Sequence, residues 1–208
     1  MEHSEPESLG QRLARNRVIP AVKVDAGLKK ALQSHHDILF LLYGDIVSLD
    51  ANVNAVLKSG KKPFVHLDMI NGLANNTVVL EYFYRHFKRE CGVITTKSNM
   101  VRKALELGIS VVQRYFMLDS LSVASAIEGI VKTRPDAIEI MPGILPRVIA
   151  HISRQTKVPV IAGGLIQTAA DIEKILASGA IATSVSRCEL WPLSLGGMPT
   201  PPKALKAE

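Results

Sequence analysis

The 208-residue chain has little cysteine and few aromatic side chains. Its two cysteines, Cys91 and Cys188, form no CxxC pair, which excludes the usual zinc-ligand spacings and a disulfide-built scaffold. No apolar run approaches the ~20 residues of a membrane-spanning helix, and the polar first residues lack the apolar segment of a secretion signal. We therefore predict a cytoplasmic protein with reduced thiols, no membrane partner, no metal and no cofactor.

Two sequence patterns of nucleotide-binding proteins are also missing. Aromatic residues make up 5% of the chain, and the aromatic motif of RNA-binding RNP sheets is not present. The GxGxxG fingerprint of dinucleotide-binding sheets is absent as well. Positive charge, in contrast, is in excess: the formal net charge is +6 and the isoelectric point is about 9.4. This excess favours an anionic partner.

Short segments rich in valine and isoleucine alternate with helical segments along the whole chain. Continuous apolar strands are typical of parallel sheets buried on both faces. Eight βα units in about 180 residues predict an α/β fold, a closed (β/α)8 TIM-type barrel with short loops. An open doubly wound sheet is the alternative, which the missing GxGxxG fingerprint disfavours. The expected strands are Val18 to Val24, Ile38 to Tyr43, Pro63 to Asp68, Gly92 to Thr95, Ser110 to Met117, Ala137 to Met141, Pro159 to Ala162 and Ile181 to Ser184.

The composition changes at the carboxyl end of the chain. We expect one barrel domain over residues 1–194. The remaining residues, 195–208, contain Gly196-Gly197, three prolines and three charged residues. Such a segment buries too little apolar surface to offset its ordering entropy, so we predict a disordered tail.

One expected strand, over residues 159–162, runs directly into the pair Gly163-Gly164. Glycines at a strand end let the backbone turn sharply and bring N–H groups close to a ligand. The next strand ends at Ser184 and is followed by Ser186. In a (β/α)8 barrel the loops after strands seven and eight commonly bind phosphate. The four residues therefore predict a phosphate cradle, and a simple tight turn is the alternative for the glycines.

Polar residues also lie at the ends of other expected strands. The ligand site of a barrel lies at the carboxyl ends of its strands, where the sequence has Asp68, Lys97, Arg114, Glu139 and Gly143. Carboxylates there would accept hydrogen bonds from hydroxyl groups while the cradle holds a phosphate. This ring of residues predicts a small polyol phosphate as the ligand.

Some of these residues have a purely structural alternative. Arg114 and Glu139 lie on neighbouring strands, where a mutual ion pair would satisfy two buried charges. That pairing and direct ligand contact both stay open. A lysine at a helix start opposes the helix dipole, which favours a ligand role for Lys97. We expect His66, close to Asp68, to be a packed and hydrogen-bonded histidine.

Six segments spread over most of the chain, from about Pro20 to Trp191, carry a family resemblance. They are His66-Leu67-Asp68 with Gly72-Leu73, Gly92 to Lys97, Gln113 to Ser120, Pro135 to Gly143, Ile161 to Ile166, and Ser186 with Leu190-Trp191. In this combination the chain resembles the glycerol-3-phosphate-responsive antiterminators of bacterial glycerol-uptake operons.

The resemblance implies a (β/α)8 regulator that senses glycerol 3-phosphate and binds leader mRNA to prevent termination, without enzymatic activity. Glycerol 3-phosphate and leader mRNA would be its partners, and a homo-oligomer is left open. The segment after the last strand departs from the family pattern, which usually has Ser-Asn there. Val185 removes a hydroxyl group, and Arg187 adds a charge beside the expected phosphate.

Basic side chains gather in the expected loops that lead into the strands. These loops share the amino-terminal rim of a barrel, where a ring of cations could grip RNA phosphates. We single out Lys61, Lys62, Arg85 and Arg89 on this rim, with Arg187 on the opposite rim as a competing RNA contact. The helix dipole also favours Lys and Arg at helix ends in any α/β protein, so the charge has a structural explanation as well.

A phosphate-substrate barrel enzyme of the aldolase, isomerase or epimerase type is the alternative function. Asp68 or Glu139 would serve as its base, and Lys97 as its electrophile or Schiff-base amine. The sequence has no acid–base pair beyond what a binding site requires, so we assign no catalytic residue. A regulator that acts through a protein partner instead of RNA is a third hypothesis.

Overall fold

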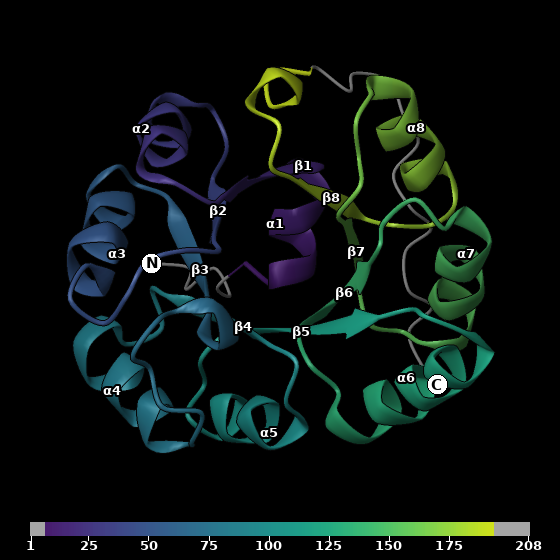
Figure 1. Ribbon diagram of the computed structural model, residues 1–208. Coiled ribbons are helices and arrows are strands. Elements are labelled where there is room, and N and C mark those ends of the chain that lie inside the picture. The colour runs from purple at the N-terminus through teal and green to yellow at the C-terminus, as the bar shows by residue number, and fades with distance from the viewer. Residues whose placement is uncertain (1–6, 194–208) are drawn as a thin grey trace, which may run out of the picture.

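The strands close into a barrel. The computed structural model describes residues 7–193, in which the strands pair in parallel from β1 to β8 and β8 returns to β1 (Figure 1). The predicted (β/α)8 barrel is confirmed, and the open doubly wound sheet is excluded. The strands are β1 (Val18–Val22), β2 (Ile38–Leu41), β3 (Lys62–His66), β4 (Gly92–Thr95), β5 (Val111–Phe116), β6 (Ala137–Met141), β7 (Val160–Gly163) and β8 (Ala182–Val185).

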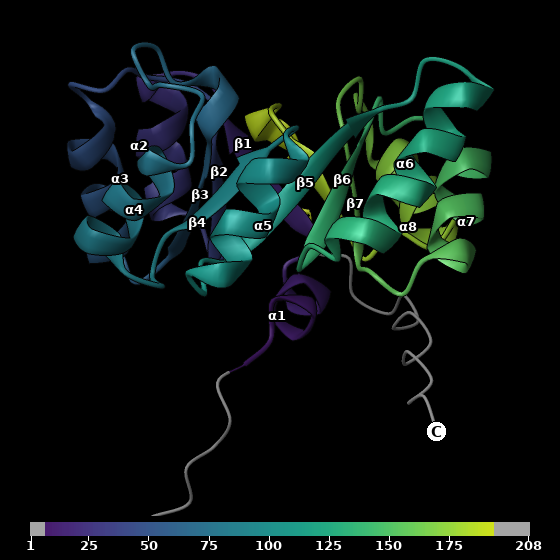
Figure 2. The ribbon, with the colours of Figure 1, turned by 90° about the horizontal axis from the view of Figure 1, so that it is seen from below.

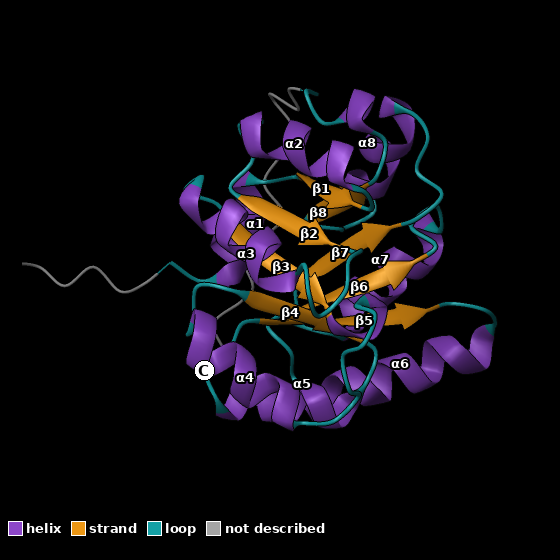
Figure 3. Cartoon of the chain, turned by 60° about the vertical axis from the view of Figure 1, so that its left-hand side comes forward, coloured by secondary structure: helices purple, strands orange, loops and turns teal. Residues whose placement is uncertain are grey.

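Helices form the outer layer of the molecule (Figure 3). Each strand from β1 to β7 is followed by an α-helix, and β8 is followed by the 3-10 turn η2 (Cys188–Leu190). A second 3-10 turn, η1 (Leu67–Met69), follows β3 directly. The α-helices are α1 (Leu9–Arg15), α2 (Asp25–Gln33), α3 (Leu49–Lys58), α4 (Val78–Phe87), α5 (Ser98–Glu106), α6 (Ser120–Thr133), α7 (Pro146–Gln155) and α8 (Ala169–Ala177).

The strands bury apolar side chains on both faces, which explains why they are continuous apolar runs in the sequence. In β1, for example, all five residues are buried. Outward side chains pack against the helices. Inward side chains fill the barrel and include Ile19, Phe40, Phe64, Ile94, Val112, Ala137, Ile161 and Ala182.

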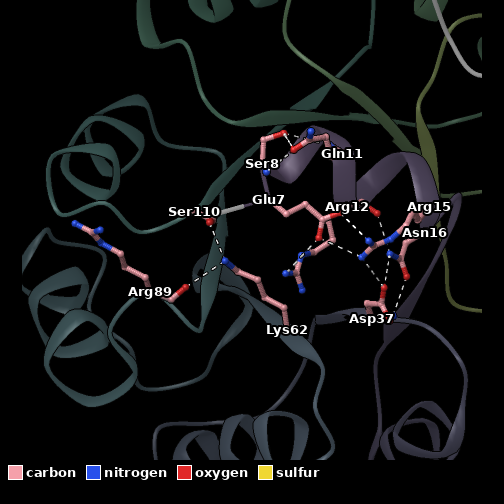
Figure 4. Close-up of polar contacts among 10 residues, drawn as sticks. All are labelled: Glu7, Ser8, Gln11, Arg12, Arg15, Asn16, Asp37, Lys62, Arg89 and Ser110. Atoms are coloured by element: carbon pink, nitrogen blue, oxygen red, sulfur yellow. Dashed lines mark hydrogen bonds and ion pairs between the residues drawn. The ribbon is translucent and has the colours of Figure 1, made fainter. Parts of the chain in front are cut away.

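Helix α1 lies across the amino-terminal end of the barrel (Figure 2). Its Leu13 is fully buried and belongs to the cluster of inward side chains. At the end of the helix, Arg15 pairs with Glu7 at 2.9 Å and with Asp37 at 3.2 Å (Figure 4). The helix thus closes this end of the barrel.

Three further predictions concern membrane-spanning helices, the two cysteines and the carboxyl-terminal residues. Within residues 7–193, none of the helices combines the length and the hydropathy needed to cross a bilayer. Cys91 and Cys188 are both free thiols. The disordered tail predicted for residues 195–208 lies outside the described residues.

Candidate ligand site at the carboxyl end of the barrel

A polar layer lies next to the apolar filling of the barrel, on its carboxyl side. Side chains alternate along a strand, so the residue two places after an inward apolar residue also points inward. On β3 and on β5 to β8, the residues reached in this way are His66, Arg114, Glu139, Gly163 and Ser184. Four of them are predicted ligand residues, whereas the sequence indicates only a packing role for His66.

Glu139 is the centre of this layer, with 0% of its side chain exposed. Its Oε2 accepts a hydrogen bond from Arg114 Nε at 2.7 Å, and its Oε1 accepts one from Ser184 Oγ at 2.5 Å. Arg114 and Glu139 are direct partners in the β5–β6 register. The predicted ion pair is therefore confirmed, and it satisfies two charges that would be costly to bury alone.

Arg114 also contacts the loop after β3. Its side chain is 5% exposed, and Nη1 lies 3.7 Å from Met69 Sδ. A guanidinium has five N–H donors, and those that Arg114 gives to Glu139 and Met69 do not exhaust the set. The structural pairing therefore leaves Arg114 able to donate to a bound anion as well.

Asp68, in η1, joins the end of β3 to the end of β4. Its carboxylate accepts from Thr96 N at 2.7 Å, from Thr96 Oγ1 at 3.1 Å, and from Thr95 Oγ1 at 3.3 Å. These bonds fix the carboxylate at the edge of the polar layer, where it is partly exposed. Thr95 and Thr96 thus position Asp68, a role that the sequence pattern did not indicate.

His66 is buried as predicted, but the expected hydrogen bonds are not found. Neither ring nitrogen has a hydrogen-bond partner among the described residues, and Nδ1 lies 3.9 Å from Asp68 Oδ2. Burial of the ring, together with the nearby Arg114 guanidinium, lowers the pKa of His66 to about 4. The neutral ring has one donor and one acceptor, and both are buried without a partner among the described residues.

This pKa has a consequence for stability. The unfolded chain binds the proton with the ordinary pKa of 6.5, so between pH 6.5 and 4 it binds more protons than the folded chain. Stability must then fall as the pH falls, by about 2 kcal/mol from pH 7 to pH 5 for this residue. Urea unfolding at the two pH values is expected to show that His66→Gln loses less stability than the unchanged protein.

The comparison with the variant isolates His66. The pKa of His36 is also lowered, chiefly by its own burial, and this residue is present in both proteins. Its contribution therefore cancels in the difference. Equal pH dependences of the two proteins would contradict the assignment of a buried, neutral His66.

Two predicted glycines make close packing possible. The Gly143 N–H donates to Gly164 O at 3.1 Å, which ties the loop after β6 to the loop after β7. A side chain on Gly163 would overlap Ser184 Oγ and lie 2.6 Å from Glu139 Oε1. Gly163 therefore makes room for the buried hydrogen bond between Ser184 and Glu139.

The turn after β7 has two successive residues at positive φ whose backbone N–H groups lack an acceptor among the described residues. Gly164 has a φ of +79° and Leu165 a φ of +59°. Neither residue donates its backbone N–H to another residue of the described chain. Successive free N–H groups in such a turn form a concave site for an anion.

Two other predicted residues, Lys97 and Ser186, lie outside the hydrogen bonds of the polar layer. Lys97 lies at the start of α5, where its backbone N–H donates to Thr95 Oγ1 at 3.2 Å, and its ammonium group has no partner among residues 7–193. Ser186 is exposed and lines a small pocket of about 160 Å³ with Lys23, Lys30 and other residues beside α2. The side chains in residues 7–193 form no cluster suited to a metal ion.

The sequence matches a known protein family. A sequence model of the glycerol-3-phosphate responsive antiterminators matches residues 18–191. Over 182 residues the chain is 32% identical to YgcP, an uncharacterised protein of Escherichia coli K12, and the match covers 88% of this chain and 95% of that protein.

Two solved structures are also similar. The glycerol uptake operon antiterminator regulatory protein of Listeria monocytogenes has 34% identity and a TM-score of 0.79, covering 84% of this chain and 94% of that one. A glycerol uptake operon antiterminator-related protein of Thermotoga maritima has 30% identity and a TM-score of 0.75, covering 85% of this chain and 98% of that one.

Proposed function

Because the chain belongs to the glycerol-3-phosphate responsive antiterminator family, we propose that it senses glycerol 3-phosphate and binds the leader mRNA of a glycerol-uptake operon to prevent termination. The ligand occupies the carboxyl end of the barrel. The protein binds this ligand without catalysing a reaction, so the ammonium of Lys97 acts as a cation and not as a Schiff-base amine.

The polar layer is the observation that carries the ligand assignment. Buried polar groups are costly unless they are hydrogen-bonded, yet both ring nitrogens of His66 lack a partner among the described residues. A ligand with hydroxyl groups supplies the missing partners once the groups that cover the ring shift to admit it. The layer is also reached from one end, because α1 covers the other end of the barrel.

The charges of the site suggest the orientation of the ligand. Asp68 and Glu139 repel a phosphate but accept hydrogen bonds from hydroxyl groups. The free N–H groups of Gly164 and Leu165 favour an anion, and the Lys97 ammonium adds positive charge at the same end of the barrel. We therefore orient the phosphate toward the turn after β7 and the glycerol hydroxyls toward Asp68 and His66.

Calorimetry tests this orientation. Glycerol 3-phosphate is expected to bind, and glycerol is expected to bind at least about 100-fold more weakly, because it lacks the charge-assisted bonds of the phosphate. Gly164→Val blocks the approach to the turn and is expected to lower the affinity for glycerol 3-phosphate by about 10-fold or more.

A matched control exists at the other end of the barrel. Gly60 has a φ of +77°, close to that of Gly164, and a side chain there would meet nothing within 4 Å. Gly60→Val carries similar backbone strain and is expected to leave the affinity unchanged. Equal binding of glycerol and glycerol 3-phosphate, or equal effects of the two variants, would refute the proposed phosphate position.

A further inference from the structure

Five helices, α3 to α6 and α8, end on the amino-terminal rim with a residue at positive φ. After α3, α5 and α8 the chain has Gly60, Gly108 and Gly179, with φ values of +77°, +70° and +108°. After α4 and α6 the positive φ belongs to Lys88 at 51° and to Arg134 at 47°. Two basic residues thus stand in a conformation for which the same chain uses glycine elsewhere.

The helix dipole does not explain this choice. It favours cations within the last turn of a helix, and Arg85 in α4 and Lys132 in α6 already occupy such places without strain. A side chain at positive φ is strained, so glycine would suit positions 88 and 134 better. Strained backbone positions cluster at functional sites, and the feature that Lys88 and Arg134 share is a positive charge.

Lys88 belongs to a groove at the end of α4. The groove has a volume of about 470 Å³ and is lined by Tyr84, Arg85, Lys88, Arg89 and Glu90. Tyr84 is 41% exposed, which is unusual for a ring that could pack against the protein. Three cations beside an exposed ring suit a strand of nucleic acid, since bases stack on aromatic rings and cations hold the phosphates.

The end of α5 lies beside the Arg89 side chain of the groove. A side chain on Gly108 would lie 2.9 Å from Arg89 Nε, so the glycine at the end of α5 leaves room for the Arg89 guanidinium. Figure 4 shows the Arg89 side chain extending away from the Lys62 ammonium, which donates to Arg89 O at 3.1 Å. Arg134 follows on the next helix end. The basic residues therefore lie at the ends of two helices, α4 and α6, with α5 between them in Figure 1.

We infer that this sector of the rim, formed by Tyr84, Arg85, Lys88, Arg89 and Arg134, is the RNA-binding surface. The inference rests on the proposed function and adds the place and the chemistry of contact. Single-stranded RNA lies along the groove, with its phosphates on the four cations and a base on Tyr84. Glu90 is the one acidic residue of the groove and limits how closely phosphates approach beside it.

The sector differs from the set predicted from the sequence. Lys61 Nζ donates to Ser34 O at 2.6 Å and to His36 O at 3.0 Å. Lys62 Nζ donates to Ser110 Oγ at 3.0 Å as well as to Arg89 O, and its burial lowers its pKa. These two lysines hold loops of the barrel together, so only Arg85 and Arg89 remain from the predicted set on this rim.

Replacement by glycine tests the surface without harming the fold. Lys88→Gly and Arg134→Gly remove a charge and relieve backbone strain, so the unfolding midpoint is expected to stay the same or rise. Fluorescence anisotropy with a labelled uridine 20-mer is expected to show about 3- to 10-fold weaker binding for each variant. The slope of log affinity against log salt is expected to fall by about 0.7 for each RNA phosphate that the variant no longer neutralises.

Two further variants complete the experiment. Tyr84→Ala is expected to weaken binding about 5-fold or more with an unchanged salt slope, because it removes stacking and no charge. Lys29→Gln removes an exposed charge in the middle of α2, a helix that α3 separates from α4 in Figure 1, and is expected to change neither quantity.

The outcomes separate the inference from the proposed function. If the unchanged protein binds neither the uridine 20-mer nor a hairpin RNA with a single-stranded loop, the RNA-binding function itself fails. If it binds RNA and the glycine variants keep the same affinity and salt slope, only the location is wrong. If a polyglutamate peptide binds as tightly as RNA and its binding is abolished in the same variants, the surface takes an acidic protein partner and the RNA assignment is overturned.

Discussion

Replacing Arg114 with methionine is expected to lower the free energy of unfolding by about 3–5 kcal/mol, because it leaves a buried carboxylate without its partner. Glu139 has 0% of its side chain exposed and would keep only the bond from Ser184 Oγ. Urea unfolding at pH 7, followed by circular dichroism, measures the loss. This is the largest change in stability that we expect from one substitution within the polar layer.

Two control variants test whether the expected loss comes from leaving a buried charge without its partner. Arg114→Met combined with Glu139→Gln removes both charges and keeps an acceptor for Ser184, so it is expected to recover most of the lost stability. Lys132→Met breaks the exposed pair with Glu128, whose side chains are both 69% exposed, and is expected to have a far smaller effect. Similar losses for Arg114→Met and Lys132→Met would mean that the polar layer is solvated and not buried.

The double variant also decides a question that the sequence leaves open. If Arg114 and Glu139 only stabilise the barrel, the double variant binds glycerol 3-phosphate as tightly as the unchanged protein. If either residue also contacts the ligand, the affinity falls although the fold is restored. Calorimetry on the double variant separates the two roles, because its stability and its affinity are measured on the same folded protein.

The barrel and the Arg114–Glu139 pair could be predicted from the sequence because they depend on short-range rules. Apolar runs and helical periodicity predict the strands and helices, and each strand lies within two residues of its predicted bounds. Consecutive strands of a barrel are neighbours. Two inward charges at matching positions of β5 and β6 must therefore meet.

Other features of the site depend on the arrangement of several segments, and the sequence could not provide them. The sequence predicts a hydrogen-bond partner for His66, but only the packed structure reveals that its neighbours offer none. Lys61 and Lys62 resemble free cations until the loops that carry Ser34 and Ser110 are in place. Ser186 follows a predicted strand, yet the turn after β8 directs it to a pocket beside α2.

Gly163→Ala is expected to lower the free energy of unfolding by about 3 kcal/mol, since the added methyl group overpacks a buried site and disturbs a buried hydrogen bond. The methyl group would overlap Ser184 Oγ and lie 2.6 Å from Glu139 Oε1. Both groups are buried and held by each other, so neither can move away at low cost. Urea unfolding of Gly163→Ala measures this loss.

A double-mutant cycle identifies the cause of the expected loss at Gly163. Ser184→Ala removes the oxygen that the new methyl group would overlap, so Gly163→Ala is expected to cost at least about 1 kcal/mol less in that background. If Gly163 served only to let a phosphate approach the backbone, Gly163→Ala would lower ligand affinity and leave stability unchanged. A loss of stability that shrinks in the Ser184→Ala background instead assigns Gly163 to the packing of the polar layer, and it leaves the phosphate to the free N–H groups of Gly164 and Leu165.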